Sequence, residues 1–282
     1  MPAYFDGKLV FVHIPKCAGT SIKKSLKDYQ LRLKPESLYY SYRMHESLFE
    51  IENWFLDKWG RERWDQSTIF STIRHPIERI VSWWKFHKTI TMMNYRVWKA
   101  AEHLPDARTL EINPLCVPYF TLQDQETYVG KVAGERCHHI TDRKHVDEFC
   151  ALSFEEFLNS MTEWKSTGCS YPLCPYHAPA PQARWLTNIN GNIPWDRLNL
   201  FLVEDLKELQ HFLPGLKEIN KENSSKSVAK KYLEKEEETS YINHLTTNSL
   251  LFLRKYYSED FKIYETLKNR PLKDIKPFRL ET

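Results

Sequence analysis

The sequence lacks cysteines spaced as C-x-x-C pairs, the spacing in which structural zinc sites present their ligands. Its six cysteines are Cys17, Cys116, Cys137, Cys150, Cys169 and Cys174. Cys169 and Cys174 are close enough in sequence to bridge in an exported protein, but the chain shows no export signal and no long apolar run. We therefore predict a cytoplasmic protein with no metal site and no membrane partner, whose cysteines are thiols.

A large excess of charge of one sign is also missing. The net charge is +3 over 282 residues and the sequence pI is about 8.4. This balance is too weak to indicate nucleic acid as a partner, but it fits a mildly basic surface that binds a small anion. With 41% hydrophobic and 14% aromatic residues, the chain can bury a sizeable core. We predict a single domain over residues 1–282.

The segment 9–21 predicts a buried strand, a phosphate-binding loop and the start of a helix. Leu9–Ile14 is apolar and rich in β-branched and aromatic residues, which is typical of a strand buried on both faces. Pro15 ends this run, and the residues Ala18, Gly19, Thr20 and Ser21 turn the chain into a helix whose first N–H groups attract anions. Lys16 adds a mobile positive charge.

Cys17 stands beside this loop and invites a comparison with cysteine phosphatases. A phosphatase-type loop would carry an arginine six positions after the cysteine, where this chain has Lys23. We therefore interpret Cys17 as a small packing residue.

A second polar cluster is predicted where the next core strand ends. Ser67–Ile73 is a core-strand pattern, Arg74 follows it, and Pro76 suits the first turn of a helix. Ser82 lies about two helical turns further on, roughly on the same face. Because carboxyl ends of parallel strands share one edge of a sheet, we expect Arg74 to lie near the first loop. An arginine fork and a hydroxyl so placed can share one phosphate.

Other elements follow from caps and periodicity. Ser47 predicts the start of a helix, and Ser153 with Glu156 forms a capping box before another. Leu198–Val203 predicts the last parallel strand, with Glu204 and Asp205 at its end as helix caps rather than catalytic carboxylates. Further predicted elements are a helix from Gly19 to about Tyr29, a strand at Ser37–Met44 and a final packing helix at Asn248–Tyr257.

Two motifs in this order resemble those of sulfotransferases that use 3′-phosphoadenosine 5′-phosphosulfate (PAPS). The string PKCAGTS at residues 15–21 resembles their 5′-phosphosulfate loop, and RHPIERIVS at residues 74–82 is similar to their 3′-phosphate motif. The sequence of the first motif is most similar to that of the carbohydrate-type branch, which includes heparan and chondroitin sulfotransferases and bacterial relatives. Residues 182–209 resemble the late segment of the family.

The resemblance implies a fold and a reaction. The fold would be α/β, a P-loop-like three-layer fold with a central parallel sheet of about four or five strands and helices on both faces. The reaction would move a sulfuryl group from PAPS to a hydroxyl or amine of a small-molecule or carbohydrate acceptor by in-line transfer, leaving PAP and requiring no metal. Residues 89–185 would be variable insertions that shape the acceptor pocket.

The resemblance also implies donor-binding residues. Those of the 5′ side are Lys16, Cys17, Ala18, Gly19, Thr20 and Ser21, those of the 3′ side are Arg74 and Ser82, and those of a loop closing over the nucleotide are Asn223, Ser225 and Lys226. Lys16 would stabilise the leaving oxygen. His45, at the end of the predicted strand Ser37–Met44, is our candidate general base, with His177 as runner-up and Glu46 as a carboxylate alternative.

Two other function classes stay open. A P-loop kinase or NTPase would place Ser or Thr directly after the lysine and an aspartate at a strand end to hold Mg²⁺. This chain has Cys17 and Arg74 at those places. A nucleotide-binding protein without catalysis is the third class, and only a measurement of activity separates it from an enzyme.

Overall fold

The computed structural model describes residues 3–34, 46–85, 153–159, 180–214, 216, 245–271 and 274–279. The chain divides into two compact units, of which the first comprises Met1–Arg79, Ala180–Asn223 and Leu253–Thr282, and the second comprises Ile80–Pro179 and Ser224–Phe252. Both the loop after the first predicted core strand and Arg74 belong to the first unit. That residues 1–282 act as one domain stays a prediction.

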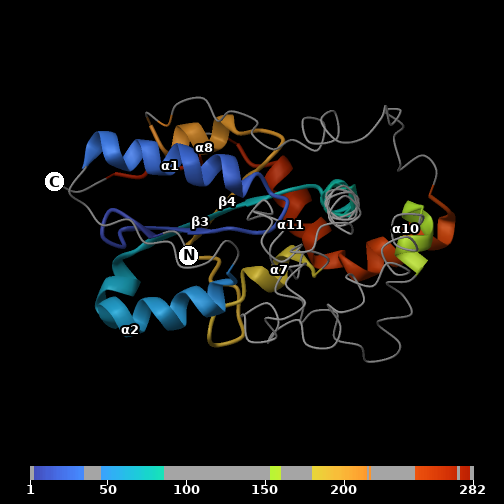
Figure 1. The fold of residues 1–282 in the computed structure, drawn as a ribbon, viewed down its shortest axis with the longest axis horizontal. Coiled ribbons are helices and arrows are strands. Elements are labelled where there is room, and N and C mark those ends of the chain that lie inside the picture. The colour runs from blue at the N-terminus through green and yellow to red at the C-terminus, as the bar shows by residue number, and fades with distance from the viewer. Residues whose placement is uncertain are drawn as a thin grey trace, which may run out of the picture. The chain divides into compact units, whose positions relative to one another are not determined.

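A four-stranded sheet with the order β1-β2-β3-β4 forms the centre of the first unit (Figure 1). The strands are β1 (Ala3–Tyr4), β2 (Leu9–Val12), β3 (Thr68–Ile73) and β4 (Leu198–Leu202). β2 pairs with β3 and β3 with β4 in parallel, with Val12 opposite Ser71 and Ile73 opposite Leu202. The three core strands predicted from the sequence are thereby confirmed.

The sheet differs from the purely parallel one that we predicted, because its edge strand β1 is antiparallel to β2. β1 is only two residues long and pairs with β2 in the antiparallel direction. The connection from Tyr4 to Leu9 is a tight turn, closed by a hydrogen bond from the Gly7 N–H to the Tyr4 carbonyl of 3.1 Å. So short a connection allows only antiparallel pairing, because parallel strands need a long crossover. The predicted strand Ser37–Met44 lies outside the described residues.

Helices pack against both faces of this sheet (Figure 1). The helices of the first unit are α1 (Gly19–Leu33) and α8 (Lys207–Phe212) on one face, and α2 (Leu48–Gln66), α7 (Gln182–Trp185) and α11 (Ser258–Lys268) on the other. α10 (Thr247–Tyr256) precedes α11, and residues 76–85 and 154–159 are also helical. None of the helices within the described ranges is long and apolar enough to cross a bilayer.

The two sides of β2 contribute to two different core clusters. Val10 and Val12 pack with α2, whereas Leu9 and Phe11 pack with α1. All four side chains are fully buried, and burying a side chain of this size contributes about 1.5–3 kcal/mol. This two-sided burial is the physical reason why the strand reads as an unbroken apolar run.

Both predicted helix starts are confirmed, and each is closed by a capping box. The Ser47 N–H donates to Glu50 Oε2 at 2.8 Å, and the Glu50 N–H donates back to Ser47 Oγ at 3.4 Å, at the start of α2. Ser153 and Glu156 make the same reciprocal pair at 2.7 and 3.2 Å. Each box occupies N–H groups that have no partner inside a helix, which fixes where these two helices begin.

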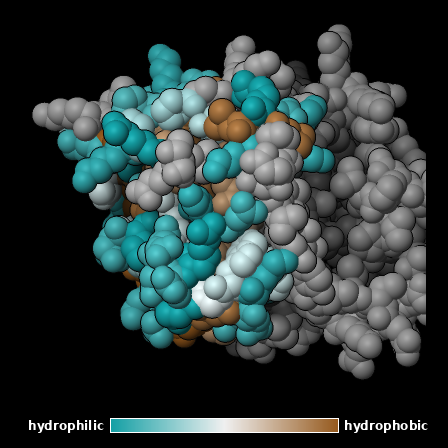
Figure 2. Space-filling model, turned by 90° about the vertical axis from the view of Figure 1, so that its left-hand side faces the viewer, coloured by the Kyte–Doolittle hydropathy of each residue, from teal (hydrophilic) through white to brown (hydrophobic). Residues whose placement is uncertain are grey.

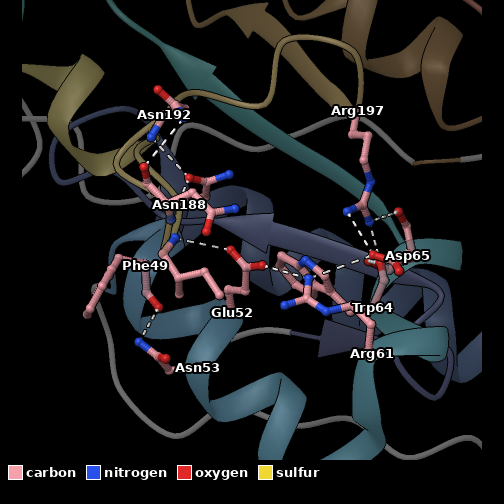
Figure 3. Close-up of polar contacts among 12 residues, drawn as sticks. Phe49, Glu52, Asn53, Arg61, Trp64, Asp65, Asn188, Asn192 and Arg197 are labelled. Atoms are coloured by element: carbon pink, nitrogen blue, oxygen red, sulfur yellow. Dashed lines mark hydrogen bonds and ion pairs between the residues drawn. The ribbon is translucent and has the colours of Figure 1, made fainter.

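Polar contacts hold the segment before β4 against α2 (Figure 3). The buried carboxylate of Glu52 accepts hydrogen bonds from Arg61 Nη1 at 3.1 Å and from the Ile189 N–H at 3.2 Å. Arg197 donates to the Trp64 carbonyl and pairs with Asp65 at 3.6 Å. These contacts bring residues 188–197 next to α2, and β4 then enters the sheet beside β3.

The side of the protein at the left of Figure 1, where α1 and α2 end, is shown in Figure 2. Hydrophilic side chains cover most of its described surface, and hydrophobic ones form separate patches near the top and the bottom. This is the end at which β3 begins. The carboxyl ends of the parallel strands, where Lys16 and Arg74 follow, lie at the opposite end of the sheet.

Candidate functional site

The loops that follow β2 and β3 meet at the carboxyl edge of the sheet, as predicted. Thr72 Oγ1 donates to the Cys17 carbonyl at 2.6 Å, and Ser71 Oγ donates to the Val12 carbonyl at 2.7 Å. Arg74 Nη1 donates to the Lys16 carbonyl at 3.5 Å. Side chains of β3 therefore hold the loop after β2 in place, and they bring Arg74 beside Lys16.

The loop itself adopts a conformation that is unusual for residues with side chains. Lys16 has φ of 67° and Ala18 has φ of 58°, both in the left-handed region, which costs roughly 1–2 kcal/mol per residue. Ala18 is the N-cap of α1, and no side chain caps the helix there. The first N–H groups of α1, at Gly19, Thr20 and Ser21, therefore suit an external anion, which the positive end of the helix also attracts.

Gly19 is required by a close approach within this loop. A Cβ atom at this position would lie 1.7 Å from Cδ2 of His13, well inside van der Waals contact. His13 is buried and stacks on Phe11 with ring centroids 5.8 Å apart. The glycine therefore accommodates an imidazole ring as well as the turn, and His13 has a packing position.

Lys16 carries a strongly perturbed ammonium group. Burial and, after it, the positive charge of Arg74 lower its pKa from 10.5 to about 8, while Cys17 acts in the opposite direction. A cation that has lost hydration and lies beside a second cation gains from a bound anion. Such perturbed groups gather at functional sites.

Cys17 is fully buried, and its thiol is unreactive at neutral pH. Burial raises the pKa of its thiol from 9.0 to about 11, against the opposing charges of Arg79 and Arg74. Its Sγ–H donates to Gln182 Oε1 at 3.1 Å. Because the thiolate is the nucleophile, a thiol with this pKa is inert at neutral pH, in agreement with our interpretation of Cys17 as a packing residue.

Arg74 is fixed through its backbone while its side chain reaches the surface. Its N–H donates to Gln182 Oε1 and its carbonyl accepts from Gln182 Nε2, both at 2.9 Å. The Arg74 side chain is 29% exposed, and its guanidinium lies 3.9 Å from Glu78, an ion pair that contributes little to stability. The guanidinium can therefore be recruited by a ligand without breaking a strong contact.

Three buried polar residues that have no predicted role hold this edge together. Arg79, fully buried, donates from Nε to the Pro15 carbonyl at 3.1 Å and from Nη1 to the Ala180 carbonyl at 2.9 Å. The other two are Gln182 and Asp260. Arg79 is the second arginine of the motif at residues 74–82, and Gln182 follows a proline in the late segment, so both belong to strings that resemble the family, whereas no local pattern marked Asp260.

A model of the sulfotransferase family matches residues 5–265, which is most of the chain. The chain belongs to the sulfotransferase family. It has no match among curated proteins or among solved structures. The family confirms the resemblance seen in the motifs and makes the protein a transferase that moves a sulfuryl group.

The acidic residues after β4 accept backbone N–H groups in this sulfotransferase, although no side chain caps α8 at its N-cap residue, Leu206. Glu204 Oε1 accepts the His75 N–H at 3.0 Å, and Asp205 Oδ1 accepts the Lys207 N–H at 3.2 Å at the start of α8. The imidazole of His75 packs edge-on against Phe261 and Tyr264, and burial lowers its pKa despite the neighbouring carboxylate of Glu204. In the described part of the sulfotransferase, no group of three or more His, Cys, Asp or Glu side chains is placed to hold a metal ion.

The remaining candidate residues of the sulfotransferase divide into those that the structure describes and those that it does not. Ser82 is buried in the helical residues 76–85 and belongs to the second unit, so its sharing of a phosphate with Arg74 stays a prediction. Glu46 is buried, and its charge raises the pKa of Lys23, which burial lowers. The candidates outside the described residues are His45, His177, Asn223, Ser225 and Lys226.

Proposed function

We propose that this sulfotransferase moves the sulfuryl group of PAPS to a hydroxyl or amine of a small-molecule or carbohydrate acceptor, in a P-loop-like three-layer fold. The observation that carries the proposal is the meeting of the loop 16–21 with Arg74 at the carboxyl edge of β2 and β3. One segment offers helix N–H groups and a lysine, and the other offers a guanidinium. Two anion-binding segments at one edge suit a nucleotide with phosphates at both its 5′ and 3′ positions.

On the 5′ side, the roles of the residues follow from where charge develops. The sulfuryl group leaves the 5′-phosphate as its bond to the acceptor forms, and negative charge builds on the phosphate oxygen that is left. Lys16 donates to that oxygen, while the N–H groups of Gly19, Thr20 and Ser21 hold the phosphate. In many enzymes, preorganised donors of this kind make the largest single contribution to the rate enhancement. The transfer as proposed needs no metal ion.

On the 3′ side, Arg74 and Ser82 bind the phosphate that distinguishes PAPS from its dephosphorylated form. Residues Asn223, Ser225 and Lys226 close over the nucleotide in this proposal. The proton of the acceptor goes to His45, with His177 and Glu46 as the alternatives. A histidine suits this task because its ordinary pKa lies near neutral pH.

Ligand binding separates this function from that of a P-loop kinase. PAP should raise the melting temperature of the protein far more than ATP with Mg²⁺ does, because only PAP presents a 3′-phosphate to Arg74. Labelled PAPS tested against acceptor libraries then measures transfer itself and separates an enzyme from a binding protein. An equal or larger shift with ATP and Mg²⁺ would contradict the proposed donor.

A further inference from the structure

Gln182 joins the two anion-binding segments through one side-chain amide. The residue is fully buried, with 0% of its surface exposed. Its Oε1 accepts the Arg74 N–H at 2.9 Å and the Cys17 Sγ–H at 3.1 Å. Its Nε2 donates to the Arg74 carbonyl at 2.9 Å and to Asp260 Oδ2 at 3.4 Å. The amide therefore uses both of its donors and both of its acceptor positions.

The pair of bonds to Arg74 fixes the direction in which that residue leaves β3. The amide binds the N–H and the carbonyl of the same residue, as a neighbouring strand would do in a ladder. This holds the peptide planes on both sides of Arg74, and hence the direction of its side chain. The same Oε1 contacts Cys17, which lies between Lys16 and Ala18 of the other segment.

The backbone of Gln182 is itself anchored from two sides. The Gln182 and Ala183 N–H groups, at the start of α7, donate to the Asp260 carboxylate at 2.7 and 2.9 Å. Arg79 links the Ala180 carbonyl to that of Pro15, the residue before Lys16. The amide thus lies on a rigid support, and its position relative to both segments is determined by buried contacts.

We infer that Gln182 is a positioning residue that sets the separation between the 5′-phosphosulfate loop and Arg74, so that both phosphates of the donor are bound at once. The inference rests on the proposed function. Gln182 contacts the backbone of Arg74 and the side chain of Cys17. Its role in this inference is to let the site distinguish ligands with a 3′-phosphate from ligands without one. Loss of this spacing affects a ligand with two phosphates more than one with a 5′-phosphate alone.

The test compares PAP with adenosine 5′-phosphate, which differ only in the 3′-phosphate, by titration calorimetry on the intact chain. Gln182→Glu keeps the shape but replaces the donor to the Arg74 carbonyl by a carboxylate oxygen. At about pH 8 we expect the affinity for PAP to fall about tenfold and that for adenosine 5′-phosphate less than about threefold, since a buried acceptor loses its donor.

Acidification supplies a readout that a general loss of structure would not give. The introduced carboxyl is buried beside Asp260, which raises its pKa, and its protonated form again donates to the Arg74 carbonyl. At about pH 5.5 the ratio of the two affinities should return to within about threefold of the wild-type ratio at that pH. Gln182→Met, which never regains a donor, should show no such return.

Gln66→Glu is the matched control, because it makes the same charge change at an exposed position at the end of α2. It should leave both affinities unchanged. If Gln182→Glu fails to fold, Asp260→Asn takes its place, because it weakens the anchor of Gln182 and should lower the affinity for PAP alone.

Unchanged discrimination in the folded variant, or equal loss for both ligands at every pH, overturns the inference. A wild-type protein that binds both ligands equally well contradicts the proposed donor instead.

Discussion

Among single residues, Lys16 combines a strained backbone with a cation that burial has weakened. Its left-handed φ places it between β2 and the uncapped start of α1. Its pKa of about 8 means that burial has made the charged form less favourable when no anion is bound. Lys16 therefore suits the stabilisation of negative charge that appears only during the reaction. A developing anion replaces the favourable interaction with water that the ammonium lost on burial.

Lys16→Ala should lower turnover by about a hundredfold or more, the cost of losing one oxyanion donor. Affinity for PAP should change much less, because the N–H groups of α1 still hold the phosphate. Turnover with labelled PAPS and calorimetry with PAP measure the two effects. Lys27→Ala, at an exposed position on α1, is the control for loss of a lysine, and near-normal turnover in Lys16→Ala would contradict the assigned role.

The lowered pKa of Lys16 also makes a prediction for stability. Between about pH 8, its folded value, and 10.5, its ordinary value, the unfolded chain binds the proton that the folded chain has lost. Stability therefore rises with pH through this window and is reduced below it. Lys16→Met should be more stable than wild type at neutral pH and lose this advantage by pH 10.5. Urea unfolding of both proteins across this pH range measures the difference in their free energies of unfolding. A difference that stays constant with pH would show that burial does not disfavour the charged form of Lys16.

Arg74→Ala tests the 3′-phosphate assignment. Loss of a charge-assisted contact should weaken PAP about tenfold or more and leave adenosine 5′-phosphosulfate nearly unchanged. Competition binding with both ligands measures the ratio. Arg32→Ala, at the exposed end of α1, should alter neither affinity, whereas an equal loss for both ligands in Arg74→Ala would remove Arg74 from the 3′ site.

The general base is tested by the pH profile of turnover in His45→Ala and His177→Ala. The variant that removes the base should lose most of its rate and the acidic limb of its profile, because that limb reports protonation of the base. PAP binding should survive in both variants. Retention of rate and limb by His45→Ala transfers the role to His177, and retention by both points to a carboxylate base such as Glu46 or to an amine acceptor.

Among the elements, the packing of α2 on the segment before β4 depends on one buried carboxylate. Glu52 is 2% exposed, whereas the Arg61 side chain that pairs with it is 53% exposed. The Ile189 N–H depends on the same carboxylate. The order β3-β4 in the sheet is therefore supported by a polar contact at its margin as well as by the core.

Glu52→Ala should destabilise the protein by about 1–3 kcal/mol, because it leaves the Ile189 N–H without its acceptor, whereas water can solvate the exposed Arg61. Urea unfolding measures the change. Asp57→Ala, at an exposed position on the same helix, should stay within about 0.5 kcal/mol of wild type. Similar values for both variants would mean that water replaces the Glu52 carboxylate without cost.

In the molecule as a whole, our proposal draws the donor site from both units, because Lys16 and Arg74 belong to the first and Ser82 to the second. The first unit contains the loop after β2, Arg74 and Gln182. The second unit contains residues 80–179, which include most of the insertions, 89–185, that the family resemblance associates with the acceptor. If the insertions shape the acceptor pocket as we propose, the identity of the acceptor depends on a region whose sequence signals are weak, whereas the donor motifs are short and specific.

The sequence by itself determined the features that rest on local signals. Burial on both faces marks β2, β3 and β4 as apolar runs, Ser47 and Ser153 mark two helix starts, and the order of Lys16 and Gly19 marks the family. Because carboxyl ends of parallel strands share an edge, the nearness of the loop 16–21 to Arg74 also followed from the sequence.

Only the tertiary structure decided which buried polar groups hold that edge. Gln182 contacts Arg74 across 108 positions and Asp260 across 78, and no local pattern encodes such distant pairs. The antiparallel β1 depends on the geometry of one tight turn, and the pKa of Lys16 depends on the burial of its ammonium next to Arg74. Periodicity predicts which residues are buried. Their hydrogen bonds and the cost of their desolvation depend on the atoms that surround them in the folded protein.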